Sequence, residues 1–401
     1  MIIDAEICGI KLGDFHPVRI MGVINLSPES FYEGSIVRNE EDALNRAINM
    51  IENGAEMIDL GAASTAPGRK EISIEKEEER LIPVLKKMVK EIDVPISVDT
   101  QSSIIAERAL KIGASIINDV SGLKKDEKML DVILNYKCPL IIMASKKRPG
   151  DLLTLSEIKN CLEETINLIE SKGVDPNDII IDPGIGRWIQ EKTYEYNLEI
   201  IKGLSSLKLL RKPILVAISR KSFIDEILNV GPPEKRLYGS LGATAIAVYE
   251  GAHIVRTHDV RETLHSIKIA ELLRKDPILV ENKEKKATLL NWISKKEDIA
   301  ALMEKIGVGE TGIRIMKEKA SFRTILIENV THKEALILKQ EILARGGEAA
   351  IPEVALRGGN NLSIIIFGTS AQISSLKKKL KKQAFDLPII ASLLDELEDI
   401  E

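Results

Sequence analysis

The sequence is poor in cysteine, in aromatic side chains and in net charge, and each shortage excludes a class of protein. Its three cysteines, Cys8, Cys138 and Cys161, lie far apart and form no CxxC pair. That spacing argues against a disulfide framework or a thiolate metal site and favours a reducing compartment. Aromatic residues make up 3% of the chain, too few for base-stacking platforms, and a net charge of −5 gives no field suited to nucleic acid.

The sequence also lacks long apolar runs. No stretch approaches the length of a membrane-spanning helix, and the first residues contain acids in place of the basic-then-apolar pattern of a signal peptide. Hydrophobic residues make up 44% and charged residues 29% of the chain, a mixture typical of globular proteins. We therefore expect a cytoplasmic protein without a membrane or nucleic-acid partner. A length of 401 residues suggests one large domain and one smaller domain.

Short apolar runs alternate with longer amphipathic segments over the first two thirds of the chain. Eight such runs occur, at residues 20–24, 57–60, 96–98, 115–117, 140–143, 179–181, 214–217 and 253–255. Their shortness and continuous apolarity are typical of parallel strands that are buried on both faces. Eight strand–helix repeats over about 250 residues predict a (β/α)₈ TIM barrel. A doubly wound open sheet is the alternative, but no GxGxxG motif follows the first run.

Polar side chains follow nearly every predicted strand at its carboxyl end. They are Asn25, Asp59, Asp99, Asn118, Asp182, Ser219 with Lys221, and Arg256 with His258. Any one of them is readily explained as a helix cap. All carboxyl ends of barrel strands face one mouth, however, so the complete set predicts a site there.

A smaller α+β domain is predicted after the barrel, with the boundary between residues 275 and 276. Residues 274–288 form a charged connector without clear periodicity. Beyond it we predict strands at 322–327, 349–356 and 362–367, and helices at 332–344 and 371–381. This β-α-β-β-α order indicates a split βαβ unit.

The residue types at the predicted mouth indicate their chemistry. Asp99 and Asn118, on neighbouring strands, can pair with the donor and acceptor edge of a 2-amino-4-oxo heterocycle. Arg256 and His258 alternate at the last strand, where barrels commonly bind phosphate, so both can face an anion. Asn25 can offer an amide oxygen to Mg²⁺, which prefers few protein ligands together with water and phosphate oxygens.

Several motifs together resemble the dihydropteroate synthases. They are MGVINLSPESF, DLGAASTAPG, SVDT, INDVSG, DPGIG, SRKSF and GSLGATAIAVYEGAHIVRTHDV, and they occur in that family's order across residues 18–272. The resemblance implies a TIM barrel that condenses 6-hydroxymethyl-7,8-dihydropterin pyrophosphate with p-aminobenzoate or a related arylamine and releases pyrophosphate.

The resemblance also implies roles for individual residues. It assigns the Mg²⁺ contact to Asn25; the pterin pocket to Asp99, Asn118, Asp182 and Lys221, with Met143 as an apolar wall; the pyrophosphate to Arg256 and His258; a mobile loop to Ser64 and Thr65; and the aminobenzoate side to Ser222. Among these, Lys221, Asp99, Arg256 and His258 are the expected catalytic residues.

The sequence departs from the family pattern at three places, all on the amine side. Ala66 replaces the usual arginine, the segment that begins at Arg187-Trp188 replaces Phe-Gly-Lys, and the fifth loop reads MASKKRPGD. Lys146, Lys147, Arg148 and Arg187 therefore suggest a larger or more anionic amine, although solvated loop charges explain them equally well.

Two further functions remain open from the sequence alone: a pterin-dependent methyltransferase and a non-catalytic pterin-binding protein. The methyltransferase would have no reason to keep Asn25, Arg256 and His258 for pyrophosphate. Small molecules are the expected partners, and the sequence leaves open whether the chain forms a homodimer.

Overall fold

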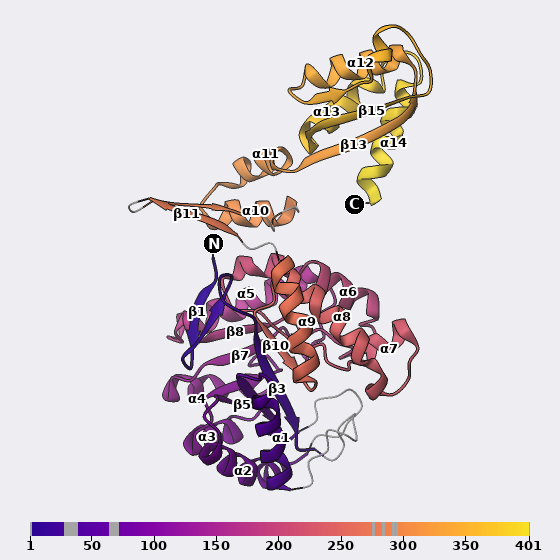
Figure 1. The fold of residues 1–401 in the computed structure, drawn as a ribbon. Helices are drawn as coiled ribbons and strands as arrows, with labels where there is room; N and C mark the ends of the chain where they lie inside the picture. Colours follow the sequence, from indigo (N-terminus) through magenta and orange to yellow (C-terminus); the bar gives the residue numbers. More distant parts are fainter. Residues whose placement is uncertain are drawn as a thin grey trace. The chain divides into compact units, whose positions relative to one another are not determined.

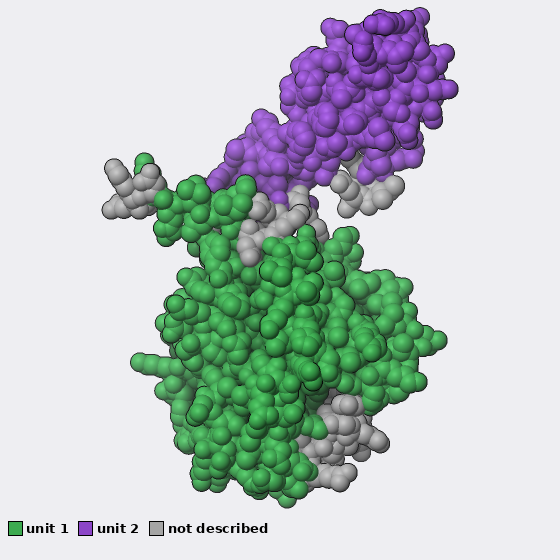
Figure 2. All heavy atoms as spheres, viewed as in Figure 1, with its two compact units in different colours: residues 1–292 green, residues 293–401 purple. Residues whose placement is uncertain are grey.

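The computed structural model describes residues 2–27, 39–63, 72–274, 277–282, 285–290, 293 and 296–400. The chain divides into two compact units, residues 1–292 and 293–401 (Figure 2). The predicted boundary lies earlier, after residue 275. In the described residues, no helix is both long enough and apolar enough to cross a membrane.

Eight parallel strands form the central sheet of the first unit, as the sequence predicts (Figure 1). They are β3 (Arg19–Asn25), β4 (Met57–Gly61), β5 (Ile96–Asp99), β6 (Ile116–Asp119), β7 (Leu140–Met143), β8 (Ile179–Asp182), β9 (Leu215–Val216) and β10 (Ile254–Thr257). Their order is β8-β7-β6-β5-β4-β3-β10-β9, and a parallel bridge between Ile181 and Ile214 joins the two ends. The sheet therefore closes into a (β/α)₈ barrel.

Nine helices in the described residues accompany the strands. They are α1 (Glu40–Glu52), α2 (Ile74–Glu91), α3 (Ser103–Ile112), α4 (Met129–Tyr136), α5 (Leu155–Ser171), α6 (Tyr194–Lys202), α7 (Ser222–Leu228), α8 (Leu237–Tyr249) and α9 (Val260–Leu273). Alternate strand residues, such as Ile58 and Val98, pack against these helices. The remaining strand residues, such as Met57 and Ile116, fill the barrel interior. Burial on both faces explains why the strands are continuous apolar runs.

An N-terminal hairpin, β1 (Asp4–Ile7) and β2 (Ile10–Gly13), was not predicted. Its Ile7 and Leu12 join the apolar cluster of the barrel interior. Behind it, Asp14 is buried beside Lys208, whose Nζ lies 2.7 Å from Asp14 Oδ1. The hairpin is thus fixed to the barrel both by apolar packing and by a buried ion pair.

The residues predicted as an irregular connector contain a hairpin instead. Strands β11 (Ile278–Asn282) and β12 (Lys285–Leu289) pair antiparallel. The prediction failed because each strand is only five residues long and has no regular alternation of apolar and polar residues, so the segment cannot be distinguished from a linker by its pattern.

The second unit contains a three-stranded antiparallel sheet in the order β13-β15-β14. Its strands are β13 (Phe322–Val330), β14 (Glu348–Ala350) and β15 (Leu362–Thr369), and its helices are α10 (Lys296–Lys305), α11 (Glu310–Ala320), α12 (His332–Leu343), α13 (Ser370–Leu380) and α14 (Leu387–Ile400). Because β15 lies between β13 and β14, the predicted split βαβ unit is present. Helices α10, α11 and α14 were not predicted. Strand β14 ends before Pro352, which has no N–H to donate, and a 3₁₀ helix (Glu353–Leu356) replaces the rest of the predicted strand.

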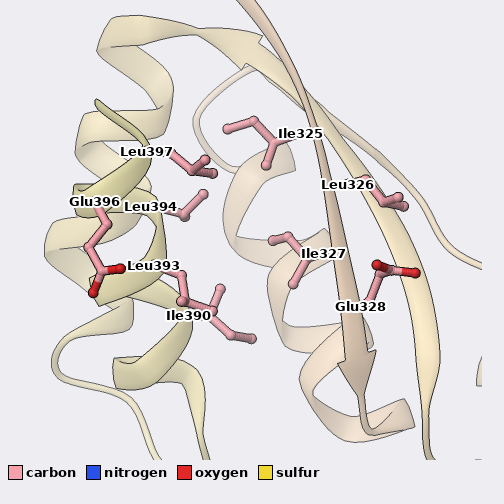
Figure 3. Close-up of a pocket in the computed structure, with 9 residues that line it drawn as sticks. All are labelled: Ile325, Leu326, Ile327, Glu328, Ile390, Leu393, Leu394, Glu396 and Leu397. Carbon is pink, nitrogen blue, oxygen red and sulfur yellow. The ribbon is translucent and has the colours of Figure 1, made fainter. Parts of the chain in front are cut away.

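A groove of about 270 Å³ lies between β13 and α14 within this second unit (Figure 3). Ile325 and Ile327 point from the strand toward the helix, whereas Leu326 and Glu328 point away from it. The lining is mostly aliphatic and, among the described residues around it, contains two glutamates as its only charged groups.

Candidate active site

The carboxyl ends of the barrel strands bring the predicted polar residues together. Strand register places Gly61 beside both Asn25 and Asp99, places Asp99 beside Asn118, and places Met143 beside Asp182. Neighbouring strands therefore end at the same level, and their terminal side chains share one mouth, as the sequence predicts.

Arg256 links two acids across this mouth. Its Nε lies 2.7 Å from Asp59 Oδ2, and its Nη2 lies 3.2 Å from Asp99 Oδ2. The Asp59 side chain is completely buried. A guanidinium can bond two carboxylates at once because its donors are fixed in a planar fork. The sequence identified Asp59 as a strand-end residue but gave it no role, and it could not show that Arg256 would bond it.

Asp99 and Asp59 lie close enough to repel each other. Burial, and next the charge of Asp59, raises the pKa of Asp99 to about 7, while Arg256 acts in the opposite direction. Two carboxylates that share one site cannot both ionise easily. The mouth therefore contains a carboxyl group whose pKa lies near neutral pH.

Two acceptor atoms in the described part of the mouth have no hydrogen-bond partner. They are Asp59 Oδ1 and Asn118 Oδ1, both buried. Asn118 Nδ2 lies 3.5 Å from Asp59 Oδ2, which fixes the orientation of the amide. Buried acceptors without donors are costly, so these two atoms indicate a ligand that carries N–H groups.

Asp182 and Lys221 add a second acid and a second base whose charges influence each other. Asp182 Oδ1 accepts a hydrogen bond of 2.7 Å from Gly184 N–H, and Lys221 Nζ donates one of 2.5 Å to Ile185 O. Burial raises the pKa of Asp182 and lowers that of Lys221 to about 8, and each charge opposes the shift of the other. A Cβ at Gly186 (φ +131°) would lie 2.7 Å from Lys221 Cδ, so only glycine leaves room for this lysine.

His258 lies between Ser219 and Asn25. Its Nδ1 is 3.0 Å from Ser219 Oγ, and its Nε2 is 3.2 Å from Asn25 Nδ2. Burial, and next the charge of Arg256, lowers the pKa of His258 to about 3, so the ring is neutral at pH 7. The consistent tautomer donates from Nδ1 to Ser219 and accepts at Nε2 from the Asn25 amide. A polar cleft of about 410 Å³ adjoins His258, and Arg46 and Arg261 are among its lining residues.

The surroundings of Asn25 fit a magnesium ion. Asn25 uses its Nδ2 group to donate to His258, so its side-chain oxygen, Oδ1, is not bonded to His258. No described residue donates a hydrogen bond to that oxygen. A Cβ at Gly61 would lie 3.6 Å from Asn25 Oδ1 and 3.8 Å from Asp99 Oδ2, so an amide oxygen and a carboxylate oxygen border the same space. The described residues contain no cluster of three His, Cys, Asp or Glu suited to a metal. One amide oxygen, completed by water and phosphate oxygens, fits the preferences of Mg²⁺.

The remaining predicted residues are less closely gathered. Met143 is buried in contact range of Gly184. Ser222 is exposed at the start of α7 and, among the described residues, makes no side-chain hydrogen bond to the network. Ser64 and Thr65 lie outside the described residues.

The four cations that suggested an anionic amine have other partners or are exposed. Arg187 forms an ion pair of 2.8 Å with Glu226. The backbone N–H groups of Lys146, Lys147 and Arg148 bond the Asp151 carboxylate, and these three side chains are exposed. A solvated loop therefore explains this segment.

An aromatic residue, Trp188, lies beside Lys221. Its ring centroid is 4.8 Å from Lys221 Nζ, within the range of a cation–π contact. Nearby, the Lys192 side chain is fully buried, which no sequence pattern predicted.

Comparisons with known proteins agree with this geometry. The family described as "Pterin binding enzyme" matches residues 21–258. A dihydropteroate synthase from Clostridium beijerinckii is 38% identical over 255 residues, which cover 63% of this chain and 93% of that protein.

Solved structures give the same result. The dihydropteroate synthase of Xanthomonas albilineans with 4-aminobenzoic acid has a TM-score of 0.60 and 30% identity, and the match covers 68% of this chain and 98% of that one. The enzyme from Clostridium difficile in the presence of pteroic acid has a TM-score of 0.58 and 38% identity, over 65% and 98% of the two chains. The chain thus belongs to the pterin-binding enzyme family, as a transferase of the dihydropteroate synthase type.

Proposed function

We propose that this chain condenses 6-hydroxymethyl-7,8-dihydropterin pyrophosphate with p-aminobenzoate or a related arylamine, with Mg²⁺ as cofactor. The observation that carries the proposal is the pair of unpartnered buried acceptors, Asp59 Oδ1 and Asn118 Oδ1, beside the Arg256–Asp99 pair. The N–H donors of a pterin ring would satisfy these acceptors. Two of the similar structures were determined with 4-aminobenzoic acid and in the presence of pteroic acid, which supports the same pair of substrates.

One group of side chains at the mouth acts on the pterin ring, and a second group holds the leaving pyrophosphate. The C–O bond between the pterin methylene and pyrophosphate breaks, and the arylamine nitrogen forms the new C–N bond and loses a proton to solvent. The carboxylates of Asp99 and Asp182 stabilise the positive charge that develops on the methylene carbon and the ring. Lys221 bonds the ring and fixes its orientation.

The leaving group is held on the other side. Arg256 supplies positive charge, whereas His258 acts as a neutral hydrogen-bonding group because of its low pKa. Asn25 would hold Mg²⁺, which when bound supplies further charge for pyrophosphate. No protein nucleophile is required.

A continuous assay of pyrophosphate release tests this function. The wild-type chain is expected to release pyrophosphate only when both substrates and Mg²⁺ are present. Asn118→Ala should lower kcat/KM for the pterin by about 100-fold, because it leaves a buried N–H group of the bound pterin ring without its hydrogen-bond acceptor. Asp93→Asn, an exposed position, is the control. Pterin binding without pyrophosphate release would contradict the proposal and favour a non-catalytic pterin-binding protein.

We propose in addition that the chain is cytoplasmic and forms a homodimer through the outer face of α8 and α9. Ile246, Ile269, Leu272 and Leu273 are 54%, 64%, 84% and 65% exposed on these adjacent helices. Apolar patches of this kind commonly mark protein interfaces. Sedimentation of the wild type and of Leu272→Glu tests this: a dimer converted to a monomer supports it, and a monomeric wild type contradicts it.

A further inference from the structure

Lys192 is a buried cation in the loop between β8 and α6, the segment where the sequence departs from the family pattern. Its side chain is 0% exposed. Its Nζ donates hydrogen bonds of 2.8 Å to Gly184 O and 3.2 Å to Gly150 O. Gly184 belongs to the loop after β8, and Gly150 belongs to the loop after β7. One ammonium group therefore joins two loops at the mouth.

Glycine is required where these loops meet. Gly150 has φ +60°, and a Cβ there would lie 2.2 Å from Trp188 Cδ1. Gly184 has φ +70°, and a Cβ there would lie 3.4 Å from Gly150 Cα. The Trp188 ring thus packs directly on the backbone of Gly150, whose carbonyl oxygen Lys192 bonds.

The same ring reaches the active-site lysine. Trp188 lies 4.8 Å from Lys221 Nζ. The contacts therefore run without interruption from Lys192 to Gly150, from Gly150 to Trp188, and from Trp188 to Lys221. Lys192 does not itself touch the reacting atoms.

Lys192 is electrostatically unfavourable where it lies. Burial, and next the charge of Lys221, lowers the pKa of Lys192 to about 7, and Asp182, Asp151 and Glu157 only partly oppose this. Both hydrogen bonds of its ammonium described above are to neutral carbonyls. An apolar side chain would avoid the desolvation cost, but it would leave the carbonyl oxygens of Gly184 and Gly150 without the donor that joins them.

We propose that Lys192 is a positioning residue that joins the loops after β7 and β8 and so holds Trp188 against Lys221. The proposal rests on the proposed function. It predicts that loss of the ammonium affects the pterin substrate more than the amine substrate. Trp188 contacts Lys221, and the Gly184 loop that Lys192 bonds also bonds Asp182; both residues belong to the proposed pterin pocket.

The test uses the full chain with Trp292→Phe, which leaves Trp188 as the only tryptophan. Lys192→Met is compared with Lys202→Met, an exposed lysine at the end of α6 whose side chain is 71% exposed. We expect Lys192→Met to raise the KM for the pterin substrate at least tenfold and the KM for the arylamine less than threefold. We also expect a red shift of Trp188 emission and at least a twofold increase in its quenching by acrylamide. Lys202→Met should leave all these quantities unchanged.

A second variant covers the case in which Lys192→Met does not fold. Gly150→Ala displaces Trp188 from the opposite end of the same contacts while Lys192 is retained, and it should give the same split between the two KM values. Equal rises in both KM values, or unchanged Trp188 emission with only a lower Tm, would overturn the proposal. If the wild type releases no pyrophosphate with any arylamine, the proposed function fails, and the emission of Trp188 still decides whether Lys192 positions that ring.

Discussion

Asp99→Asn should make the protein more stable at alkaline pH while it disables catalysis. Burial and the neighbouring Asp59 raise the pKa of Asp99 from 3.8 to about 7. In the unfolded chain the same carboxyl ionises freely. The folded state therefore binds more protons than the unfolded state between these two values, and stability falls as the pH rises through this window.

The size of the effect follows from the shift. One pKa unit corresponds to about 1.4 kcal/mol, so from pH 5 to pH 7 the ionisation of Asp99 removes about 2 kcal/mol from the free energy of unfolding, and nearly 3 kcal/mol by pH 8. Asparagine cannot ionise, so this loss is absent in the variant. Asparagine can still accept a hydrogen bond from Arg256, although a weaker one. The weaker bond lowers the stability of the variant by a similar amount at every pH. The difference in stability between variant and wild type should thus increase by about 3 kcal/mol between pH 5 and pH 8.

Urea unfolding at pH 5 and pH 8 measures this difference. Trp188 in the Trp292→Phe background reports on the barrel unit. Asp93→Asn provides the same chemical change at an exposed position, and its difference from wild type should be independent of pH. In the pyrophosphate assay, Asp99→Asn should lower kcat/KM by about 10²-fold because a carboxylate that stabilises developing charge is lost.

A constant stability difference between pH 5 and pH 8 would refute this reasoning. It would mean that Asp99 titrates at the same pH in the folded and unfolded states. Retained activity would instead refute the role of the carboxylate and leave the electrostatic argument intact.

Two other perturbations act on buried ion pairs. Arg256→Met should abolish pyrophosphate release and destabilise the protein by about 3–5 kcal/mol, because it leaves two carboxylates unpaired; adding Asp59→Asn should restore much of the stability, measured by urea unfolding, but no activity. Asp14→Asn should cost about 3–5 kcal/mol at pH 7 by leaving Lys208 buried without its partner, with no change in kcat. The nearby His253 imidazole and the Lys208 charge hold the pKa of Asp14 below its ordinary value in spite of burial. This difference should therefore shrink as the pH falls below about 4, as acid titration of both proteins can measure.

The barrel could be predicted because its strands are buried on both faces. Strand β8 begins with three consecutive isoleucines, all buried, and Asp182, the polar residue that follows them, marks its carboxyl end. The same rule located the mouth. Hairpin β11–β12 and helix α10 followed no comparable rule, because their residues are largely exposed and carry little apolar periodicity.

The pairings within the site could not be predicted. Arg256 and Asp59 are 197 positions apart in the chain, and their contact depends on closure of the barrel. The sequence also gave no reason to expect Lys192 inside the protein, because a lysine beside glutamine and glutamate indicates a solvated loop. Its burial follows from two carbonyl oxygens that only the folded loops bring together.

The two ends of the barrel contain similar buried acids, and comparing them shows which end is built for a ligand. At the closed end, both oxygens of Asp14 have partners: Lys208 Nζ at 2.7 Å and Ile3 N–H at 2.9 Å. At the mouth, Asp59 Oδ1 and Asn118 Oδ1 have none among the described residues. The paired oxygens of Asp14 stabilise the folded state. The unpaired oxygens at the mouth destabilise it, since an unsatisfied buried acceptor costs about 1–3 kcal/mol. A donor-rich ring bound at the mouth would remove that penalty, so the unpaired acceptors explain why affinity for a pterin belongs to this end alone.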